Sequence, residues 1–154
     1  MIVVKCTDLD RKALEGISIE PKEIEDDGFD WHEILVKKPW GHEIERYRDE
    51  RVSVWLLYLE TDKETSMHCH PSKTTLLMMI RGNVILSTLK DIQHLSEGDC
   101  VVIEKGAFHR SSSAGGAAVM YELESPPNKR DLVRLHDSYG RGQGYEKVCV
   151  NSTP

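Results

Sequence analysis

The chain alternates apolar and polar residues over many short segments, each of which ends at turn-forming residues. Successive side chains on a strand point to opposite faces, so this alternation is typical of strands with one face toward a core. The segments expected to form strands are Arg51–Glu60, Met67–His70, Leu76–Ile80, Asn83–Leu89, Val101–Ile103, Phe108–Ser112 and Ala117–Leu123. Turn signals stand between them, for example at Arg81-Gly82-Asn83 and Ala114-Gly115-Gly116. Many short strands punctuated by turns predict an all-β protein, either a sandwich or a barrel.

The two ends of the chain carry a different pattern. Ile2–Val4 is a candidate short strand, and Asp8 is a candidate N-cap for a short helix. Residues 20–30 are acidic and include a proline and a glycine, which favours a surface loop. A mobile tail is expected over residues 140–154. The predicted division is an N-terminal extension over 1–38, a β-barrel over 39–125 and a C-terminal extension packing on the barrel over 126–154.

Composition restricts the class of partner. With 154 residues the chain has the size of one domain and can bury a core without disulfide or metal staples. Its net charge is -6 and its basic residues are interspersed with acidic ones, which argues against nucleic acid or an anionic membrane as partner. No apolar run is long enough to cross a bilayer. We therefore expect a small-molecule ligand.

The four cysteines form no C-x-x-C pair, and the N-terminus lacks the charged-then-apolar layout of a signal peptide. Both observations favour reduced thiols and a cytoplasmic location.

Three histidines make a candidate metal site. His68 and His70 stand two residues apart on a predicted strand, so their side chains point the same way, about 6 to 7 Å apart at Cα. His109 follows a turn signal at the end of another strand, and antiparallel pairing could bring it to the same place. Three imidazoles suit a divalent ion such as Zn, Fe, Mn or Ni and leave coordination positions for water or substrate.

The histidine region resembles the two motifs of the cupins, G-x5-H-x-H-x3,4-E-x6-G and G-x5-P-x-G-x2-H-x3-N. His68, His70 and Gly82 match the first motif, with Thr75 at the glutamate position. The second motif is matched at Gly98, Gly106 and His109, with Glu104 and Ser113 in place of its proline and asparagine. The resemblance implies a cupin-type double-stranded β-helix, a jelly-roll barrel, and a homodimer.

Further segments resemble the type II phosphomannose isomerases, including those fused to mannose-1-phosphate guanylyltransferases. These are Lys38-Pro39-Trp40-Gly41, Val119–Glu124, Asp131–Leu135 and Asp137–Arg141. The resemblance covers residues 38–141. It implies a metal-dependent isomerase or epimerase-like enzyme that acts on a sugar phosphate or nucleotide sugar in carbohydrate metabolism.

The missing glutamate leaves the charge of a dication unbalanced, so a substitute carboxylate is expected. Glu122 is the stronger candidate, since it lies on a predicted core strand, and Glu64 is the weaker, since it suits a solvated turn. Lys73 stands near the position of the lost glutamate; either an anionic substrate lies between it and the metal, or it points to solvent.

The stretch Asp131–Leu135 resembles the segment of type II phosphomannose isomerases that lies next to the pocket. This resemblance implies that Arg134 holds an anionic group of the substrate with paired hydrogen bonds, the alternative being a surface ion pair with Asp131 or Asp137. The catalytic candidates are therefore Glu122, Arg134 and Lys73. A second function class stays open, a non-catalytic cupin that binds a sugar or other small metabolite as a sensor or accessory protein.

The remaining histidines are weaker candidates. His32 and His94 are expected at the surface and His136 in the C-terminal segment, while His42 is left open as a pocket residue.

Overall fold

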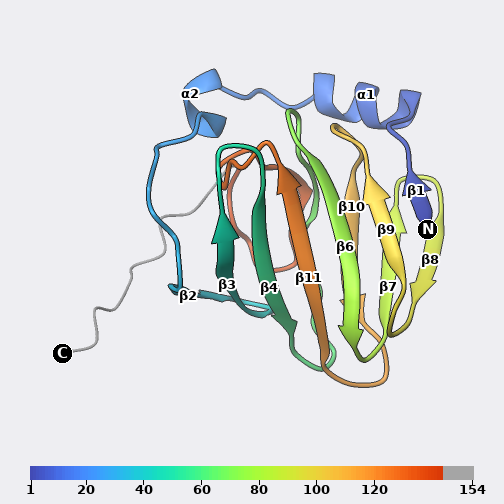
Figure 1. The fold of residues 1–154 in the computed structure, drawn as a ribbon. Helices are drawn as coiled ribbons and strands as arrows, with labels where there is room; N and C mark the ends of the chain where they lie inside the picture. The colour runs from blue at the N-terminus through green and yellow to red at the C-terminus, as the bar shows by residue number, and fades with distance from the viewer. Residues whose placement is uncertain (144–154) are drawn as a thin grey trace.

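In the computed structural model, which describes residues 1–143, the chain folds into two β-sheets that face each other (Figure 1). The larger sheet has seven strands in the order β1-β9-β6-β11-β4-β3-β2, and the smaller has five in the order β12-β5-β10-β7-β8. The strands are β1 (Ile2–Val4), β2 (Leu35–Lys38), β3 (Gly41–Arg48), β4 (Ser53–Leu59), β5 (Met67–Cys69), β6 (Thr74–Arg81), β7 (Val84–Thr88), β8 (Ile92–Leu95), β9 (Cys100–Ile103), β10 (His109–Ser113), β11 (Ala118–Ser125) and β12 (Val133–His136). The predicted all-β architecture is confirmed.

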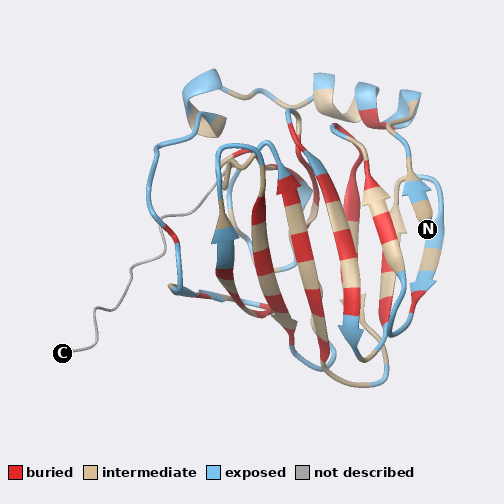
Figure 2. Cartoon of the chain, in the orientation of Figure 1, coloured by how far each residue is buried: buried red, intermediate tan, exposed pale blue. Residues whose placement is uncertain are grey.

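The core lies between the two sheets. Along β4 every second residue is buried, so that Trp55, Leu57 and Leu59 point inward (Figure 2). Val84 and Leu86 of β7 pack against the same cluster from the opposite sheet. Burying a side chain of this size stabilises the fold by roughly 1.5–3 kcal/mol, so the inner faces of the strands hold the sandwich together.

Both segments expected to flank the barrel add strands to it. β1 pairs in parallel with β9, and β2 pairs antiparallel with β3, so residues before position 39 form both edges of the larger sheet. β12 pairs with β5 at the edge of the smaller sheet. The domain boundaries themselves stay a prediction of the sequence.

Two short helices, α1 (Asp8–Glu15) and α2 (Pro21–Ile24), cover one open end of the sandwich (Figure 1). The N-cap of α1 is Thr7, so the assignment of Asp8 as the cap was wrong. Thr7 and Asp10 form a capping box in which each side chain accepts a hydrogen bond from the other's backbone N–H. The loop expected over residues 20–30 contains α2, with Pro21 at its first position, where a missing N–H costs nothing.

Gly41 allows the turn between β2 and β3 to lie against β4. Its φ is 146°, and an added Cβ would stand 2.0 Å from the carbonyl oxygen of Tyr58. No L side chain tolerates that approach, so the Pro39-Trp40-Gly41 turn depends on glycine.

No helix within residues 1–143 is long and apolar enough to span a membrane. Cys6, Cys69 and Cys100 are free thiols, as predicted. Cys149 and most of the predicted tail lie outside the described residues.

Candidate metal centre and its pocket

Two neighbouring strands bring the three histidines together. His68 lies on β5 directly opposite His109 at the start of β10, and His70 follows β5 by one residue. Their ligand nitrogens all lie within 4.8 Å of one another. Bonds of about 2.0–2.1 Å to one ion allow at most about 4.2 Å between two ligand atoms, so a small side-chain adjustment would let all three bind it.

Backbone carbonyls fix the orientation of each imidazole. The Nδ1 atoms lie 2.8 Å from the oxygen of Ser66 for His68, 2.6 Å from Asp131 for His70 and 3.0 Å from Ala107 for His109. A carbonyl only accepts, so each Nδ1 carries the proton and each Nε2 keeps its lone pair. Hydrogen bonds of this kind hold metal-binding histidines in the correct tautomer.

The electrostatics of the three rings suit a cation. Burial lowers the pKa of His68 and His70 well below the usual value, and lowers that of His109 to about 4. All three rings are therefore neutral at pH 7. The buried Nε2 of His70 has no hydrogen-bond partner, which is the state that a missing metal bond would leave. The residues present fit a divalent ion.

Glu122 lies beside the histidines but outside their set. It projects inward from β11, and its Oε1 is 3.9 Å from Nε2 of His70. Burial raises its pKa to about 7, with the neighbouring Glu124 adding to the effect. Among residues 1–143 the converging ligand set contains three histidines and no carboxylate. Glu122 therefore stands where it could act on a molecule bound to the metal.

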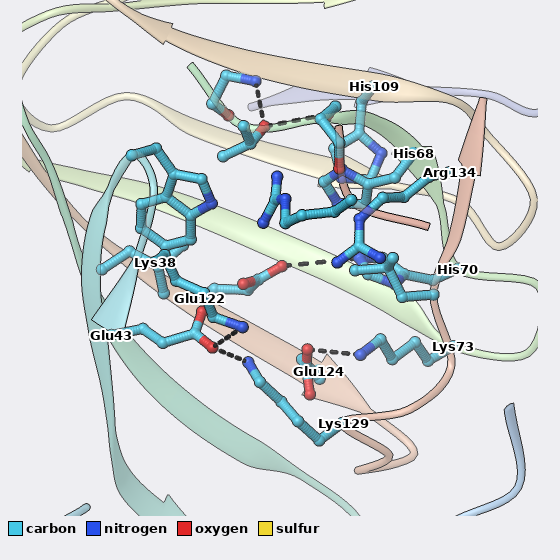
Figure 3. Close-up of a pocket in the computed structure, with 17 residues that line it drawn as sticks. Lys38, Glu43, His68, His70, Lys73, His109, Glu122, Glu124, Lys129 and Arg134 are labelled. Atoms are coloured by element: carbon cyan, nitrogen blue, oxygen red, sulfur yellow. Dashed lines mark hydrogen bonds and ion pairs between the residues drawn. The ribbon is translucent and has the colours of Figure 1, made fainter. Parts of the chain in front are cut away.

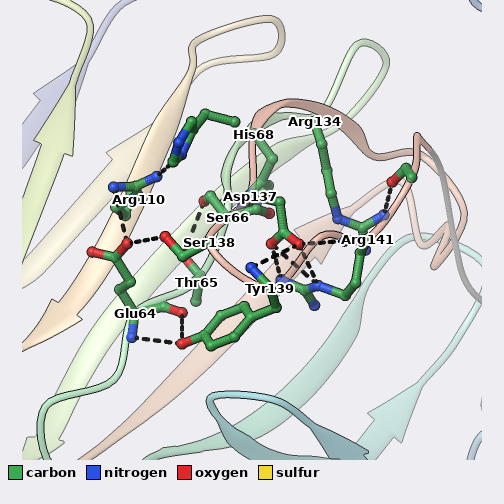
Figure 4. Close-up of polar contacts among 12 residues, drawn as sticks. Glu64, Thr65, Ser66, His68, Arg110, Arg134, Asp137, Ser138, Tyr139 and Arg141 are labelled. Carbon is green, nitrogen blue, oxygen red and sulfur yellow. Dashed lines mark hydrogen bonds and ion pairs between the residues drawn. The ribbon is translucent and has the colours of Figure 1, made fainter.

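Glu64 does not face this centre. Its carboxylate contacts Ser138 at 2.6 Å and Arg110 at 3.1 Å, and the hydroxyl of Tyr139 bonds to its backbone N–H and C=O (Figure 4). The alternative that Glu64 replaces the lost glutamate was wrong. Instead Glu64 fastens the C-terminal segment to the barrel.

Lys73 is buried, so the expectation that it might point to solvent was wrong. Its Nζ lies 2.5 Å from Glu124 and 2.9 Å from the carbonyl of Asn128. The carboxylate of Glu124 therefore supplies the negative charge beside Lys73 that the sequence analysis expected an anionic substrate to supply. Any catalytic role of Lys73 stays a prediction.

Arg134 is 5% exposed and lines the pocket, so it is not a surface residue. One of its guanidinium nitrogens donates to the carbonyl of Gly142 at 2.7 Å. Asp137 is engaged by Arg141, whose hydrogen bonds outweigh burial and hold the pKa of that carboxyl below its usual value. Arg134 and Arg141 both line the pocket.

The sequence argument missed a second charged cluster opposite the histidines. Glu43 pairs with Lys129 at 2.6 Å and Lys38 at 3.2 Å (Figure 3). Lys129 also lies over the ring of Trp55. Burial alone would raise the pKa of Glu43, but Lys129 and Lys38 hold it at about 2. The sequence carried one signal of this cluster. Glu43 and His42 are neighbours on β3, so their side chains point to opposite faces of the sheet, and that of Glu43 points inward.

His42 itself points the other way. It is stacked on Tyr58 of the adjacent strand, with ring centroids 4.9 Å apart, on the outer face of the sheet. The possibility that His42 is a pocket residue is therefore wrong. Trp40 is buried and lines the pocket.

The pocket encloses a cavity of about 60 Å³. Its charged lining comprises five basic side chains, Lys38, Lys73, Lys129, Arg134 and Arg141, and three acidic ones, Glu43, Glu122 and Glu124.

Comparison with known proteins supports the fold. No protein-family model matches the chain. An RmlC-like cupin from Shewanella frigidimarina superposes with a TM-score of 0.57 at 13% identity, over 67% of this chain and 92% of that one. A sugar phosphate isomerase-like protein from Acidithiobacillus ferrooxidans superposes with a TM-score of 0.52 at 19% identity, over 62% and 67%. The chain has the cupin fold.

One relative matches in sequence. The chain is 25% identical over 150 residues to the mannose-1-phosphate guanylyltransferase of Escherichia coli K12, which covers 92% of this chain and 31% of that protein. The chain therefore spans less than a third of the length of the guanylyltransferase.

The structure shows where two of the motif positions lie. Thr75, at the glutamate position, is buried on β6 and does not line the pocket. Gly106 has a φ of 79° in the turn before β10 and keeps the glycine that the second motif requires.

Proposed function

We propose that this chain is a metal-binding cupin that acts on a sugar phosphate or nucleotide sugar, as an isomerase or epimerase-like enzyme. The observation that carries the proposal is the placement of Glu122 beside three neutral imidazoles whose Nε2 atoms converge. A metal site next to a carboxylate combines the two groups that proton transfer next to a carbonyl requires.

The charge of the pocket supports an anionic substrate. Five basic and three acidic side chains line it, which leaves an excess of two positive charges before any metal is bound. Because these groups are buried, their field is weakly screened and a phosphate entering the pocket is attracted. Arg134 and Arg141 could bind phosphate oxygens with paired hydrogen bonds.

His68, His70 and His109 would hold the metal. A divalent ion there would polarise a carbonyl or hydroxyl oxygen of the substrate. Glu122 would take the proton from the hydroxyl-bearing carbon next to the carbonyl carbon and return it to the carbonyl carbon, while the hydroxyl proton passes to the former carbonyl oxygen. In an epimerisation the proton would return to the carbon that lost it. The paired charges of Glu43 and Lys129 would hold hydroxyl groups on the opposite wall.

The cavity constrains how the substrate binds. A volume of about 60 Å³ is small beside the roughly 300 Å³ or more of ordinary ligand pockets. It accommodates the reacting end of a sugar, and the rest of the substrate would extend past Arg134 and Arg141.

The relatives support the substrate class. One is a mannose-1-phosphate guanylyltransferase and another is a sugar phosphate isomerase-like protein. The chain covers 31% of the former, so that enzyme's whole activity is not implied for this chain.

Solvent deuterium incorporation tests the proposal. Metal-loaded protein is incubated in D2O with a panel of aldose and ketose phosphates and nucleotide sugars, and carbon-bound deuterium is measured by mass spectrometry. We expect incorporation with the wild type, and loss in Glu122→Gln with ligand binding retained. Glu64→Gln, whose side chain lies outside the pocket, is the matched control.

A second candidate is a cupin that binds such a ligand without converting it. The absence of a carboxylate from the converging set among residues 1–143 favours it. Saturable binding without deuterium incorporation would establish this candidate, and absence of binding to every anionic sugar would refute both.

A further inference from the structure

Lys38 lines the pocket on the wall opposite the histidines. It is the last residue of β2 and alternates with Val36, which is buried, whereas Lys37 between them is exposed. Val36 is paired with Glu43 in the register of β2 and β3, so Lys38 and Glu43 lie diagonally on the same inner face. The side chain of Lys38 is 13% exposed. Its amine is therefore nearly enclosed and borders the cavity.

A single carboxylate serves two lysines at this wall. The ammonium nitrogens of Lys129 and Lys38 both contact Oε1 of Glu43, at 2.6 Å and 3.2 Å (Figure 3). One negative charge balances only one of the two positive charges. The nearer lysine, Lys129, also lies 3.6 Å from the ring centre of Trp55, and this contact favours its charged form. Lys38 is therefore the lysine of this pair that loses its proton more easily.

The surrounding charges separate the two lysines further. Burial lowers the pKa of Lys38 below its usual value, and the positive charges of Lys129 and Arg134 add to this effect, which outweighs the attraction of Glu43. Burial alone would also lower the pKa of Lys129, but the neighbouring carboxylates, Glu43 first among them, raise it. Neighbouring groups whose pKa values move in opposite directions are typical of groups with separate catalytic roles. Lys38 suits the role of a nucleophile and Lys129 that of an acid.

We propose that Lys38 is a nucleophile that forms an imine with a short-chain aldehyde or ketone bearing an anionic group. This activity uses the pocket of the proposed function but does not require a metal. A neutral lysine amine attacks carbonyl carbon, and desolvation beside another cation is the usual way to obtain one. Arg134 and Arg141 line the same pocket and suit the anionic group. The cavity of about 60 Å³ restricts the ligand to a short carbonyl compound.

Proton transfers through Lys129 balance the reaction. The amine of Lys38 forms a C–N bond to the carbonyl carbon, the carbonyl oxygen takes a proton from Lys129, and the nitrogen returns one proton to Lys129. The new hydroxyl takes a second proton from Lys129 and leaves as water, so the C–O bond breaks and a C=N bond forms. The nitrogen then returns its remaining proton to Lys129. Amine and carbonyl have become imine and water, and the step needs no oxidant or reductant.

Reductive trapping tests the proposal. Wild-type protein is incubated with dihydroxyacetone phosphate and sodium cyanoborohydride, which reduces an imine to a stable amine, and the product is analysed by intact mass and peptide mapping. We expect one reduced adduct per chain, on Lys38. Lys38→Arg keeps the positive charge but lacks the nucleophilic amine, so it should lose the adduct with an unchanged circular dichroism spectrum. Lys37→Arg is the matched control, because Lys37 is exposed on the same strand, and it should be labelled like the wild type.

Two further measurements sharpen the test. Lys129→Arg should slow adduct formation by about 100-fold, because a guanidinium keeps its charge but does not release its proton, and an unchanged rate would overturn the role of Lys129. Chelator-treated wild type should form the adduct at the same rate as metal-loaded protein. An adduct without any deuterium incorporation would support this proposal and count against the proposed function, so the two proposals fail separately.

The wild type alone is sufficient to refute the proposal. Absence of an adduct with dihydroxyacetone phosphate, glyoxylate and pyruvate alike would overturn it, as would an adduct that maps to lysines other than Lys38. An adduct that persists in folded Lys38→Arg would overturn it as well.

Discussion

His68 and His109 lie directly opposite each other on β5 and β10, and their ring centroids are 4.4 Å apart. This single register position joins two segments that are distant in the sequence. Because β5 is also paired with β12, the same strand connects the histidines to Arg134. The proposed metal site and the proposed anion site therefore depend on one three-stranded arrangement.

The buried pair of Lys73 and Glu124 is predicted to be destabilising when broken from one side. Both side chains are at most 2% exposed, so Lys73→Met should lower the free energy of unfolding by about 3–5 kcal/mol by leaving Glu124 unpaired. The double variant Lys73→Met/Glu124→Leu should recover most of that loss. Urea denaturation of the single and double variants measures both effects.

An exposed pair provides the control. Arg46 and Glu33 are bonded at 2.9 Å but about half exposed, so Arg46→Ala should cost less than about 1 kcal/mol. Equal losses for Lys73→Met and Arg46→Ala would contradict the assignment of Lys73 to the core.

Gly41→Ala is predicted to be severely destabilising. The new Cβ would stand 2.0 Å from a backbone oxygen of β4, and a clash with backbone cannot be relieved by a side-chain rotation. Gly115→Ala provides the comparison, since its φ of 74° is also positive but nothing lies within 4 Å. We expect about 1–2 kcal/mol for Gly115→Ala and a much larger fall in unfolding free energy for Gly41→Ala. Similar melting temperatures for the two would refute this explanation.

Glu43 is predicted to make stability depend on pH in acid. The pKa of Glu43 is about 2 in the folded state, which is below that of a glutamate in the unfolded chain. Between these two pKa values the unfolded state therefore binds more protons than the folded state. The stabilisation is therefore complete above about pH 4.5 and lost as pH falls toward 2. Relative to wild type, Glu43→Gln should lose about 3 kcal/mol at pH 7, and the difference should shrink to near zero at pH 2.

Chemical denaturation across pH measures that difference. Asp8→Asn is the control, because Asp8 is on the surface in an exposed pair with Arg11. A constant gap between wild type and Glu43→Gln from pH 7 to pH 2 would show that Lys129 and Lys38 do not hold the charge of Glu43.

Arg134 is predicted to bind the anionic group of the ligand. Arg134→Ala should weaken the binding of a phosphorylated sugar by about 2 kcal/mol, or about 30-fold, because a charge-assisted hydrogen bond contributes roughly 1.5–3 kcal/mol. Metal content should not change. Calorimetric titration measures the affinity, with Arg46→Ala as the control, and unaltered affinity in Arg134→Ala would remove the proposed anion site.

The sequence was informative where spacing and alternation set the geometry. Strand alternation predicted that His68 and His70 share a face, and it also places Glu122 on the inner side of β11. These positions depend on local periodicity, which one sequence displays directly.

Contacts between distant segments could not be predicted in this way. The pairing of Lys73 with Glu124 and of Glu43 with Lys129 joins residues on separate strands or loops, and no local pattern specifies it. The edge strand β8 was also missed as a separate element, because its exposed residues alternate weakly. Capping geometry at Thr7 likewise depends on the backbone rather than on the residue type alone.

Metal stoichiometry tests the central claim most directly. Untagged protein is stripped with chelator, reloaded with a single divalent metal, desalted and assayed by inductively coupled plasma mass spectrometry. The account predicts one ion per chain in the wild type, loss of that ion in His68→Ala and in His109→Ala, and full retention in His94→Ala, whose histidine is exposed on β8. Metal bound equally by all four proteins, or by none of them, would contradict the assignment of His68, His70 and His109 as the metal centre.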